Sequence, residues 1–227
     1  MLSPWYLAEN FRHLQLVNGS LTFFVNDSLT NCNTYNYSND KMLHRTMTNV
    51  YLCIQIPTPI MNEIDFPALQ SHILAHRFFE SDVHGLAHWQ QVERNGLLLT
   101  TETEADSVVV RLFALFHDSK RRHDGPDILH GARGAEFAKE CFEEQRLDIT
   151  QEQFDKLYHA CKFHTAERRS GDATIDTCYD ADRLDLGRVG MKLDPGKMAT
   201  TFGARIAQRS LEEGIKPENM REWLSGI

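Results

Sequence analysis

The sequence predicts an all-α fold for residues 61–227, with a shorter segment of different character before them. From residue 61 onward, apolar residues recur with the spacing of amphipathic helices, and few runs show the alternation typical of strands. Polar residues that cap helices, and breaks at Gly or Pro, separate these runs. Composition changes near residue 60, because residues 1–60 hold eight of the eleven asparagines and only three acids against three bases.

We therefore expect residues 1–60 to be an N-terminal extension, irregular or β-containing, and residues 61–227 to be one helical domain. Two runs in the extension, LTFFV (21–25) and NVYLCIQI (49–56), are β-like. The polar stretch NCNTYNYSND (31–40) lies between them.

The helical pattern of the larger domain divides into successive segments. The expected helices cover 67–80, 84–96, 101–118, 130–145, 149–165 and 180–190, and two more lie between 204 and 223. Asn95-Gly96 is a stop signal for the second of them, and residues 119–127 and 169–179 are expected to be loops. The helix over 101–118 is almost wholly apolar, which indicates deep burial. Thr150 and Gln153 have the spacing of a capping box, with Asp148 as the alternative cap.

Charge, hydropathy and cysteine content argue against several classes of protein. The formal net charge of -8 and a pI near 5.7 disfavour duplex nucleic acid as a partner, because that affinity comes mostly from Lys and Arg. No apolar run approaches the roughly 18 residues that span a bilayer, so we expect no membrane partner. The N-terminus lacks the basic start of a signal peptide, and the five cysteines have no CxxC spacing. We therefore expect a cytoplasmic protein with reduced thiols.

The pair His117-Asp118 ends the apolar helix. A buried charge at that position costs several kcal/mol unless it has a partner. The structural alternative is a histidine at the helix end followed by a capping aspartate. The same dipeptide recurs at His123-Asp124, in a polar and basic loop, where we interpret it as solvated.

Further histidines and aspartates lie on neighbouring predicted helices. His84 and His88 are four residues apart and share one helix face. Three aspartates crowd a predicted helix start, where capping is the alternative role: Asp180, Asp182 and Asp185. Imidazole nitrogens and carboxylate oxygens together suit a divalent transition metal.

The order His, His-Asp, Asp on successive helices resembles the HD superfamily of metal-dependent phosphohydrolases. The resemblance covers roughly residues 70–195, in the stretches HGLAHWQQVERNG, LFALFHD, HGARGAEFA, FHT and DADRLDLGRVG. It implies an HD-domain-like helical bundle that binds a divalent cation: Mn, Co, Ni, Fe or Zn, with Mg as a further option. The implied ligands are His88, His117, Asp118 and Asp182. His84 would lie beside them or beside the substrate, and Asp180 and Asp185 would bond to ligand imidazoles.

The number of metal ions stays open. Some HD enzymes bind a second ion through histidines between the His-Asp pair and the last Asp, and His130 and His164 lie in that interval. These two histidines would bind such an ion, face the substrate phosphate, or simply occupy helix ends. Trp89 is either a core aromatic or a platform for a substrate base.

The ligand set and the resemblance predict a metal-dependent phosphohydrolase acting on a small phosphate ester, with nucleotides as the leading class. Metal-activated water would attack phosphorus, with Asp118 as the catalytic ligand and His84 or His164 as the general acid. Six cations are candidates for binding the substrate phosphate: Lys120, Arg121, Arg122, Arg133, Arg183 and Arg188. The alternatives are a non-catalytic HD-like module that binds a nucleotide or a protein, and metal chemistry on a non-phosphate substrate. The sequence leaves the oligomeric state open.

Overall fold

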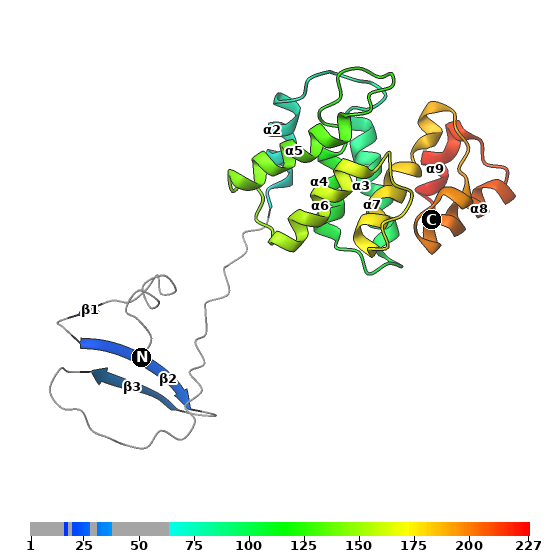
Figure 1. The fold of residues 1–227 in the computed structure, drawn as a ribbon. Coiled ribbons are helices and arrows are strands. Elements are labelled where there is room, and N and C mark those ends of the chain that lie inside the picture. The colour runs from blue at the N-terminus through cyan, green and yellow to red at the C-terminus, as the bar shows by residue number, and fades with distance from the viewer. Residues whose placement is uncertain (1–15, 18–19, 28–30, 38–63) are drawn as a thin grey trace. The chain divides into compact units, whose positions relative to one another are not determined.

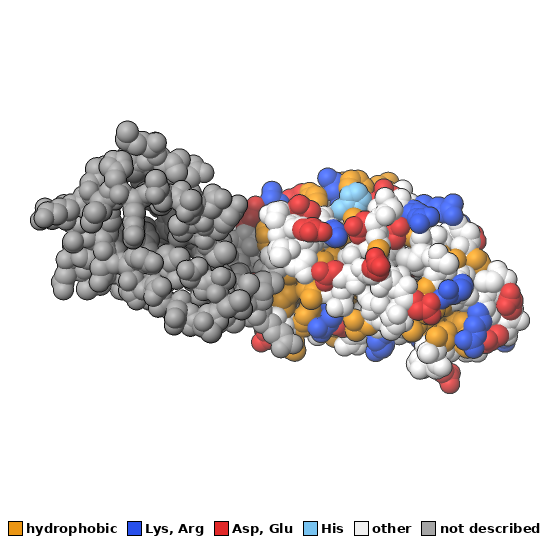
Figure 2. All heavy atoms as spheres, turned by 90° about the horizontal axis from the view of Figure 1, so that it is seen from below, with side chains coloured by type: hydrophobic (Ala, Val, Ile, Leu, Met, Phe, Trp, Pro, Cys, Tyr) orange, Lys and Arg blue, Asp and Glu red, His pale blue; other side chains and the backbone are white. Residues whose placement is uncertain are grey.

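A computed structural model describes residues 16–17, 20–27, 31–37 and 64–227. Contacts divide the chain into two compact units, Met1–Ile60 and Met61–Ile227, and each is described by itself. Within the described residues, no helix combines the length and apolarity needed to cross a membrane. Figure 2 shows acidic, basic and apolar side chains interspersed on one face of the helical unit.

The first unit contains a three-stranded antiparallel sheet, in the order β1-β2-β3 (Figure 1). Its strands are β1 (Leu16–Val17), β2 (Ser20–Asp27) and β3 (Asn31–Tyr37). Strand β2 contains the β-like run 21–25. The polar stretch from residue 31 is not predicted to be a strand, yet it forms β3, because its Thr and Tyr residues favour extended backbone. The other β-like run, 49–56, lies outside the described residues.

The second unit contains helices and no strand over residues 64–227, which confirms the predicted all-α fold. In Figure 1, α8 and α9 lie together at one end of this unit, and α2 and α5 lie at the other. Three 3-10 turns lie in its C-terminal part: η1 (Leu186–Val189), η2 (Pro195–Lys197) and η3 (Pro217–Asn219). Its α-helices are α2 (Phe66–Ala75), α3 (Leu86–Thr100), α4 (Ser107–Phe116), α5 (His130–Glu143), α6 (Gln151–Phe163), α7 (Ala173–Arg183), α8 (Thr201–Glu212) and α9 (Met220–Leu224).

Helix α4 is the centre of the core. Its N-cap, Asp106, accepts hydrogen bonds from the backbone N–H groups of Val108 and Val109, at 2.9 and 3.3 Å. Seven of its ten residues are buried, and α3, α6 and α7 pack around it. A helix that is apolar on nearly every side is stable only in an interior. Its C-terminal end, at His117, is therefore buried as well.

Helix α3 does not stop at Asn95-Gly96, as its sequence predicts, but continues to Thr100. A Cβ atom at Gly96 would collide with Val110 Cγ1 of α4. Gly96 thus marks the close approach of two helices and is not a C-terminal cap. The buried Asn95 side chain donates to the carbonyl oxygen of Ala181 at 3.0 Å, which ties α3 to α7.

Helix α2 is shorter than predicted and ends at Ala75. The Lys120 ammonium donates to the carbonyl oxygen of His76 at 2.6 Å, so a side chain from another segment satisfies a carbonyl group at this helix end. Residues 76–85 then run as a loop to the start of α3.

Helix α7 begins inside the stretch 169–179, which was expected to be a loop. Asp172 caps it by accepting from the backbone N–H groups of Thr174 and Ile175, at 2.8 and 3.1 Å. Asp180 and Asp182 consequently lie in the last turns of a helix and not at the start of one. The predicted capping box of Thr150 is present at the start of α6.

Candidate metal centre and adjoining cleft

Four side chains from three helical segments converge on one point: His88 from α3, His117 and Asp118 from the end of α4, and Asp182 from α7. The Nε2 atoms of His88 and His117 lie 3.1 Å apart. Asp182 Oδ1 lies 3.3 Å from the His88 nitrogen and 4.0 Å from the His117 nitrogen. Asp118 Oδ2 lies 3.6 Å from each of them. The structure therefore brings together all four residues that were predicted as ligands.

The Nδ1 atoms of His88 and His117 form hydrogen bonds that point away from the shared point. His88 Nδ1 donates to Asp185 Oδ2 at 2.7 Å. His117 Nδ1 donates to the carbonyl oxygens of Phe113 and Ala114, at 3.1 and 3.2 Å. Carbonyl and carboxylate oxygens only accept hydrogen bonds, so Nδ1 carries the proton in the neutral rings. Each Nε2 atom therefore offers a lone pair to the shared point.

A second group of ligand-type atoms lies beside the first. His130 Nε2 lies 3.0 Å from His164 Nε2 and 3.1 Å from Asp118 Oδ1. His130 Nδ1 donates to the carbonyl oxygen of Asp127 at 2.5 Å, and His164 Nδ1 donates to that of Cys161 at 2.8 Å. These rings also present Nε2 atoms to each other. Asp118 belongs to both groups and directs a different oxygen to each.

The donor atoms of both groups fit a divalent ion. Two unprotonated nitrogens that face each other at such a distance repel unless a cation lies between them. Ligands held at about 2.1 Å from one ion, roughly 90–110° apart, are separated by about 3.0–3.4 Å. The His88–His117 separation of 3.1 Å and the His130–His164 separation of 3.0 Å match that range. Imidazole and carboxylate donors suit Mn, Fe, Co, Ni or Zn.

Burial and neighbouring charges set the protonation of these groups. Burial lowers the pKa of His117 to about 3. Burial, the largest single effect, also lowers the pKa of His88, but its bonds with Asp182 and Asp185 and the charge of Asp182 together outweigh it, so the net shift of that pKa is upward. Burial alone would raise the pKa of Asp118, yet the His117 and His130 rings hold that pKa well below its usual range. Ionised Asp118 and neutral His117 are the forms that bind a metal.

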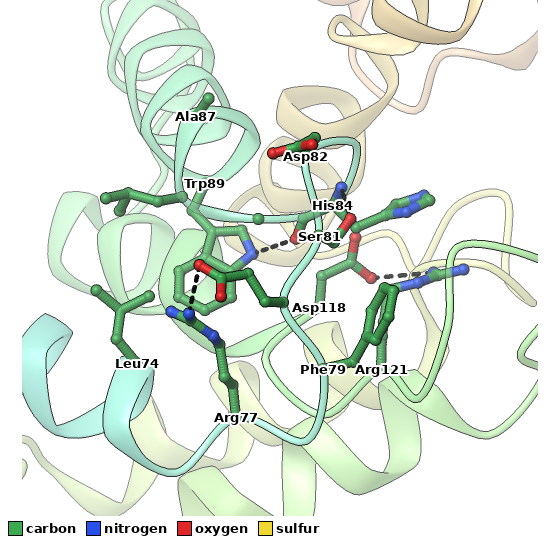
Figure 3. A pocket seen from close by; sticks show the side chains of 13 residues that line it. Leu74, Arg77, Phe79, Ser81, Asp82, His84, Ala87, Trp89, Asp118 and Arg121 are labelled. Atoms are coloured by element: carbon green, nitrogen blue, oxygen red, sulfur yellow. Dashed lines mark hydrogen bonds and ion pairs between the residues drawn. The ribbon is translucent and has the colours of Figure 1, made fainter.

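A cleft of about 260 Å³ opens beside Asp118 (Figure 3). The loop 76–85, the start of α3 and Arg121 line it, and its apolar walls include Leu74, Phe79, Leu86 and Ala87. Trp89 borders the cleft but is only 2% exposed, and its Nε1 atom donates to the carbonyl oxygen of His84 at 2.8 Å. Trp89 is therefore a core aromatic and not a stacking platform.

His84 lies in the cleft wall, near Ser81 (Figure 3). It is hydrogen-bonded to Asp124. His84 Nδ1 donates to Asp124 Oδ1 at 2.9 Å. The Ser81 hydroxyl also donates to Asp124 and accepts from the His84 backbone N–H at 2.7 Å. Asp124 is exposed and belongs to neither donor group, as expected, but its carboxylate also links two loops beside the cleft. Burial lowers the pKa of His84, although the Asp124 bond opposes that shift.

Of the six cations predicted to bind phosphate, Arg121 is the one that lies in the cleft. Its Nη1 atom lies 3.3 Å from Asp118 Oδ1 and 3.3 Å from the ring nitrogens of His130. Its Nη2 atom donates to the carbonyl oxygen of Gly125 at 3.0 Å. Its Nε atom is buried and has no hydrogen-bond partner among the described residues.

The structure does not bring the other five cations to the cleft. The Arg122 side chain is exposed. The other four donate hydrogen bonds to oxygens in loops and at helix ends. Lys120 donates to the His76 carbonyl and Arg133 to the Asp127 carboxylate. Arg183 donates to the Glu167 carbonyl and Arg188 to the Val83 carbonyl. Proximity in sequence to the ligands therefore did not predict where these side chains lie, because the four bonded ones turn towards neighbouring segments and not towards the cleft.

The two aspartates expected to support ligand imidazoles behave differently. Asp185 accepts from His88, as predicted. Asp180 instead accepts from the backbone N–H groups of Ala199 and Thr200, at 2.7 and 2.8 Å, and so anchors the start of α8. Sequence reasoning missed Arg221, which bonds to Asp185. Nothing in the local sequence marks this residue, because it lies 36 positions from its partner.

Comparison with known proteins supports the fold. No protein-family model matches the sequence. No curated protein matches it either. A crystal structure of a predicted HD superfamily hydrolase from an uncultured Thermotogales bacterium is similar, with a TM-score of 0.52 and 24% sequence identity. The similarity covers 70% of this chain and 91% of that chain, so the chain has the helical fold of that structure, as its sequence predicts.

Proposed function

We propose that the helical unit is a metal-dependent phosphohydrolase whose substrate is a small phosphate ester, with nucleotides as the first class to test. The observation that carries this proposal is the convergence of His88, His117, Asp118 and Asp182 beside a cleft. The description of the similar structure as a predicted HD superfamily hydrolase supports the same class of enzyme.

The two groups of donors would hold two ions that share Asp118. Such ions activate water as a nucleophile near neutral pH and polarise a phosphoryl oxygen. Asp118 and Asp182 offset the positive charge of the centre. The Nδ1 bonds of His88 and His117 fix the rings before any ligand arrives, so little reorganisation is needed on binding.

Arg121 is the proposed phosphate-binding cation. It lies at the edge of the cleft beside Asp118, and its buried Nε atom has no hydrogen-bond partner among the described residues. A guanidinium group binds phosphate oxygens through parallel hydrogen bonds and stabilises the charge that develops on them in the transition state.

His84 is the proposed general acid, in preference to His164. The Nε2 atom of His164 faces His130 within the second donor group, whereas His84 lies in the wall of the cleft. Because Asp124 holds Nδ1 of His84, the proton that titrates is on Nε2. This proton would pass to the leaving-group oxygen as its bond to phosphorus breaks.

The test is release of phosphate or pyrophosphate from a panel of nucleotides and small phosphate esters, with Mn, Co or Ni added. We expect His117→Ala and Asp118→Ala to lose metal and activity together, and His123→Ala, in the exposed loop, to keep both. The loss of activity should exceed the roughly 10–100-fold loss that follows removal of a residue hydrogen-bonded to a metal ligand. Full activity in either ligand variant would contradict the proposal.

A further inference from the structure

The short C-terminal helix α9 supplies a side chain that reaches the metal centre through one intermediate residue. Arg221 Nε donates to Asp185 Oδ1 at 2.7 Å, and Arg221 Nη2 donates to Asp185 Oδ2 at 2.7 Å. The same Oδ2 atom accepts from His88 Nδ1 at 2.7 Å. We propose that Arg221 is a positioning residue for the ligand His88, acting through Asp185, so that tight metal binding requires α9. This inference rests on the proposed metal centre.

The geometry explains why an arginine is suited to this position. Asp185 is 1% exposed, and a carboxylate bonded only to an imidazole can still rotate about its own Cβ–Cγ bond. Two parallel bonds from one planar guanidinium fix both of its oxygens. A fixed Oδ2 atom in turn fixes the His88 ring, because its Nδ1–H bond sets the direction in which Nε2 points.

The neighbouring cation does not replace Arg221. Arg188 Nη1 lies 3.8 Å from Asp185 Oδ2, beyond hydrogen-bond distance. Its guanidinium donates to two carbonyl oxygens instead, those of Val83 and Asp185, at 3.0 and 3.1 Å. Arg188 therefore contributes positive charge near Asp185 but does not orient its carboxylate.

Packing brings Arg221 to this position. Met220 and Leu224 of α9 are buried and anchor the helix in the core. At Gly187 in η1, a Cβ atom would collide with the carbonyl oxygen of Pro217 and would lie 3.0 Å from the Cβ of Met220. The glycine thus allows η3 and α9 to approach η1, which directly follows Asp185.

The experiment measures the affinity of the full chain for Mn²⁺ by calorimetric titration, with thermal unfolding of the metal-free protein as a parallel readout. We expect Arg221→Ala to bind Mn²⁺ about tenfold more weakly than the wild type. This is the lower end of the range for losing a residue that supports a metal ligand. Arg221→Lys should fall between the two, since an ammonium group cannot fix both oxygens. Methylguanidinium added to Arg221→Ala should restore part of the affinity, which a merely structural loss would not allow.

Arg205→Ala is the matched control. Arg205 lies on α8, is 58% exposed and pairs with Glu102, so its loss removes a cation from the same region without touching Asp185. Its affinity for Mn²⁺ should equal that of the wild type. If Arg221→Ala does not fold, Arg221→Gln answers the same question.

Three results would overturn the inference. Wild-type affinity in Arg221→Ala or Arg221→Gln would refute it while leaving the proposed metal centre intact. An equal fall in Arg205→Ala would show a general effect of charge in this region. An absence of Mn²⁺ binding by the wild type would remove the proposed function together with this inference.

Discussion

The Nε2 atoms of His88 and His117 lie 3.1 Å apart, although 29 residues separate the two histidines along the chain. Both Nδ1 atoms are already bonded to acceptors, so the two facing nitrogens must share one proton or one ion. The packing of α3 against α4 enforces this approach. Metal binding should therefore relieve an unfavourable contact and stabilise the folded state.

We expect added Mn²⁺ or Co²⁺ to raise the thermal unfolding temperature of the wild type. An ion at one hundred times its dissociation constant stabilises a fold by about 2.7 kcal/mol. For a domain of this size, that corresponds to a rise of roughly 5–10 °C. Calorimetric melts with and without metal measure it. His123→Ala should show the same rise, and a rise of equal size in a His88→Ala, His117→Ala double variant would contradict the assignment.

The second donor group predicts a change in metal stoichiometry. His130→Ala or His164→Ala should reduce the metal bound per chain from two ions to one, because each removes a nitrogen donor from the second group and leaves the first intact. Elemental analysis of the dialysed proteins measures this ratio. His159→Ala is the control, since His159 bonds to Glu167 outside both groups. Unchanged stoichiometry in both variants would show that the second group binds no ion.

Loss of the proposed general acid should depend on the leaving group. His84→Gln should slow hydrolysis of alkyl phosphates by about 10²–10⁴-fold, and should affect 4-nitrophenyl phosphate much less, because that leaving group needs no proton. Asp124→Asn should show the same pattern to a smaller extent, since it removes the bond that orients His84. Rate constants for a series of leaving groups measure it. Equal losses across the series would assign His84 a binding role instead.

The stability that the loop between α4 and α5 contributes to the fold should depend on pH, because Asp127 titrates. The Arg133 guanidinium, bonded at 2.5 Å, lowers the pKa of Asp127 to about 2. A depressed pKa means that the carboxylate contributes stability above its ordinary pKa and that this contribution is lost as pH falls through about 4 towards about 2. Asp127→Asn should therefore destabilise the protein by about 1–2 kcal/mol near neutral pH and by less near pH 3.

Denaturant titrations at both pH values measure this difference. Asp148→Asn, at an exposed position, serves as the control and should change little at either pH. A difference between wild type and Asp127→Asn that grows as the pH falls would contradict the prediction.

The contact between α3 and α4 at Gly96 should be intolerant of a methyl group. Gly96→Ala places its Cβ against Val110 Cγ1 and should destabilise the fold by about 1–3 kcal/mol, the usual effect of overpacking. Val110→Ala removes the opposing methyl groups, so the double variant should be more stable than the sum of the two single effects predicts. Equilibrium unfolding of all four proteins measures the coupling, and strict additivity would mean that the helices separate freely here.

The sequence by itself determined the all-α fold of the helical unit, the Thr150 capping box and the order of the four central donors. These features depend on local periodicity, on caps within one turn, and on residue types that retain their chemistry wherever the chain carries them. The structure showed that His88, His117, Asp118 and Asp182 converge, which their order along the chain had led us to expect.

Only the tertiary structure decided which of several identical groups belongs to the site. Arg121 lies in the cleft and Arg122 does not, Asp185 supports a ligand and Asp180 anchors α8, and Asp124 is bonded to His84 in spite of its polar surroundings. Arg221 reaches the centre from a distant helix. The physical reason is that the direction of a side chain depends on the segment packed against its backbone, and that segment is often remote in sequence.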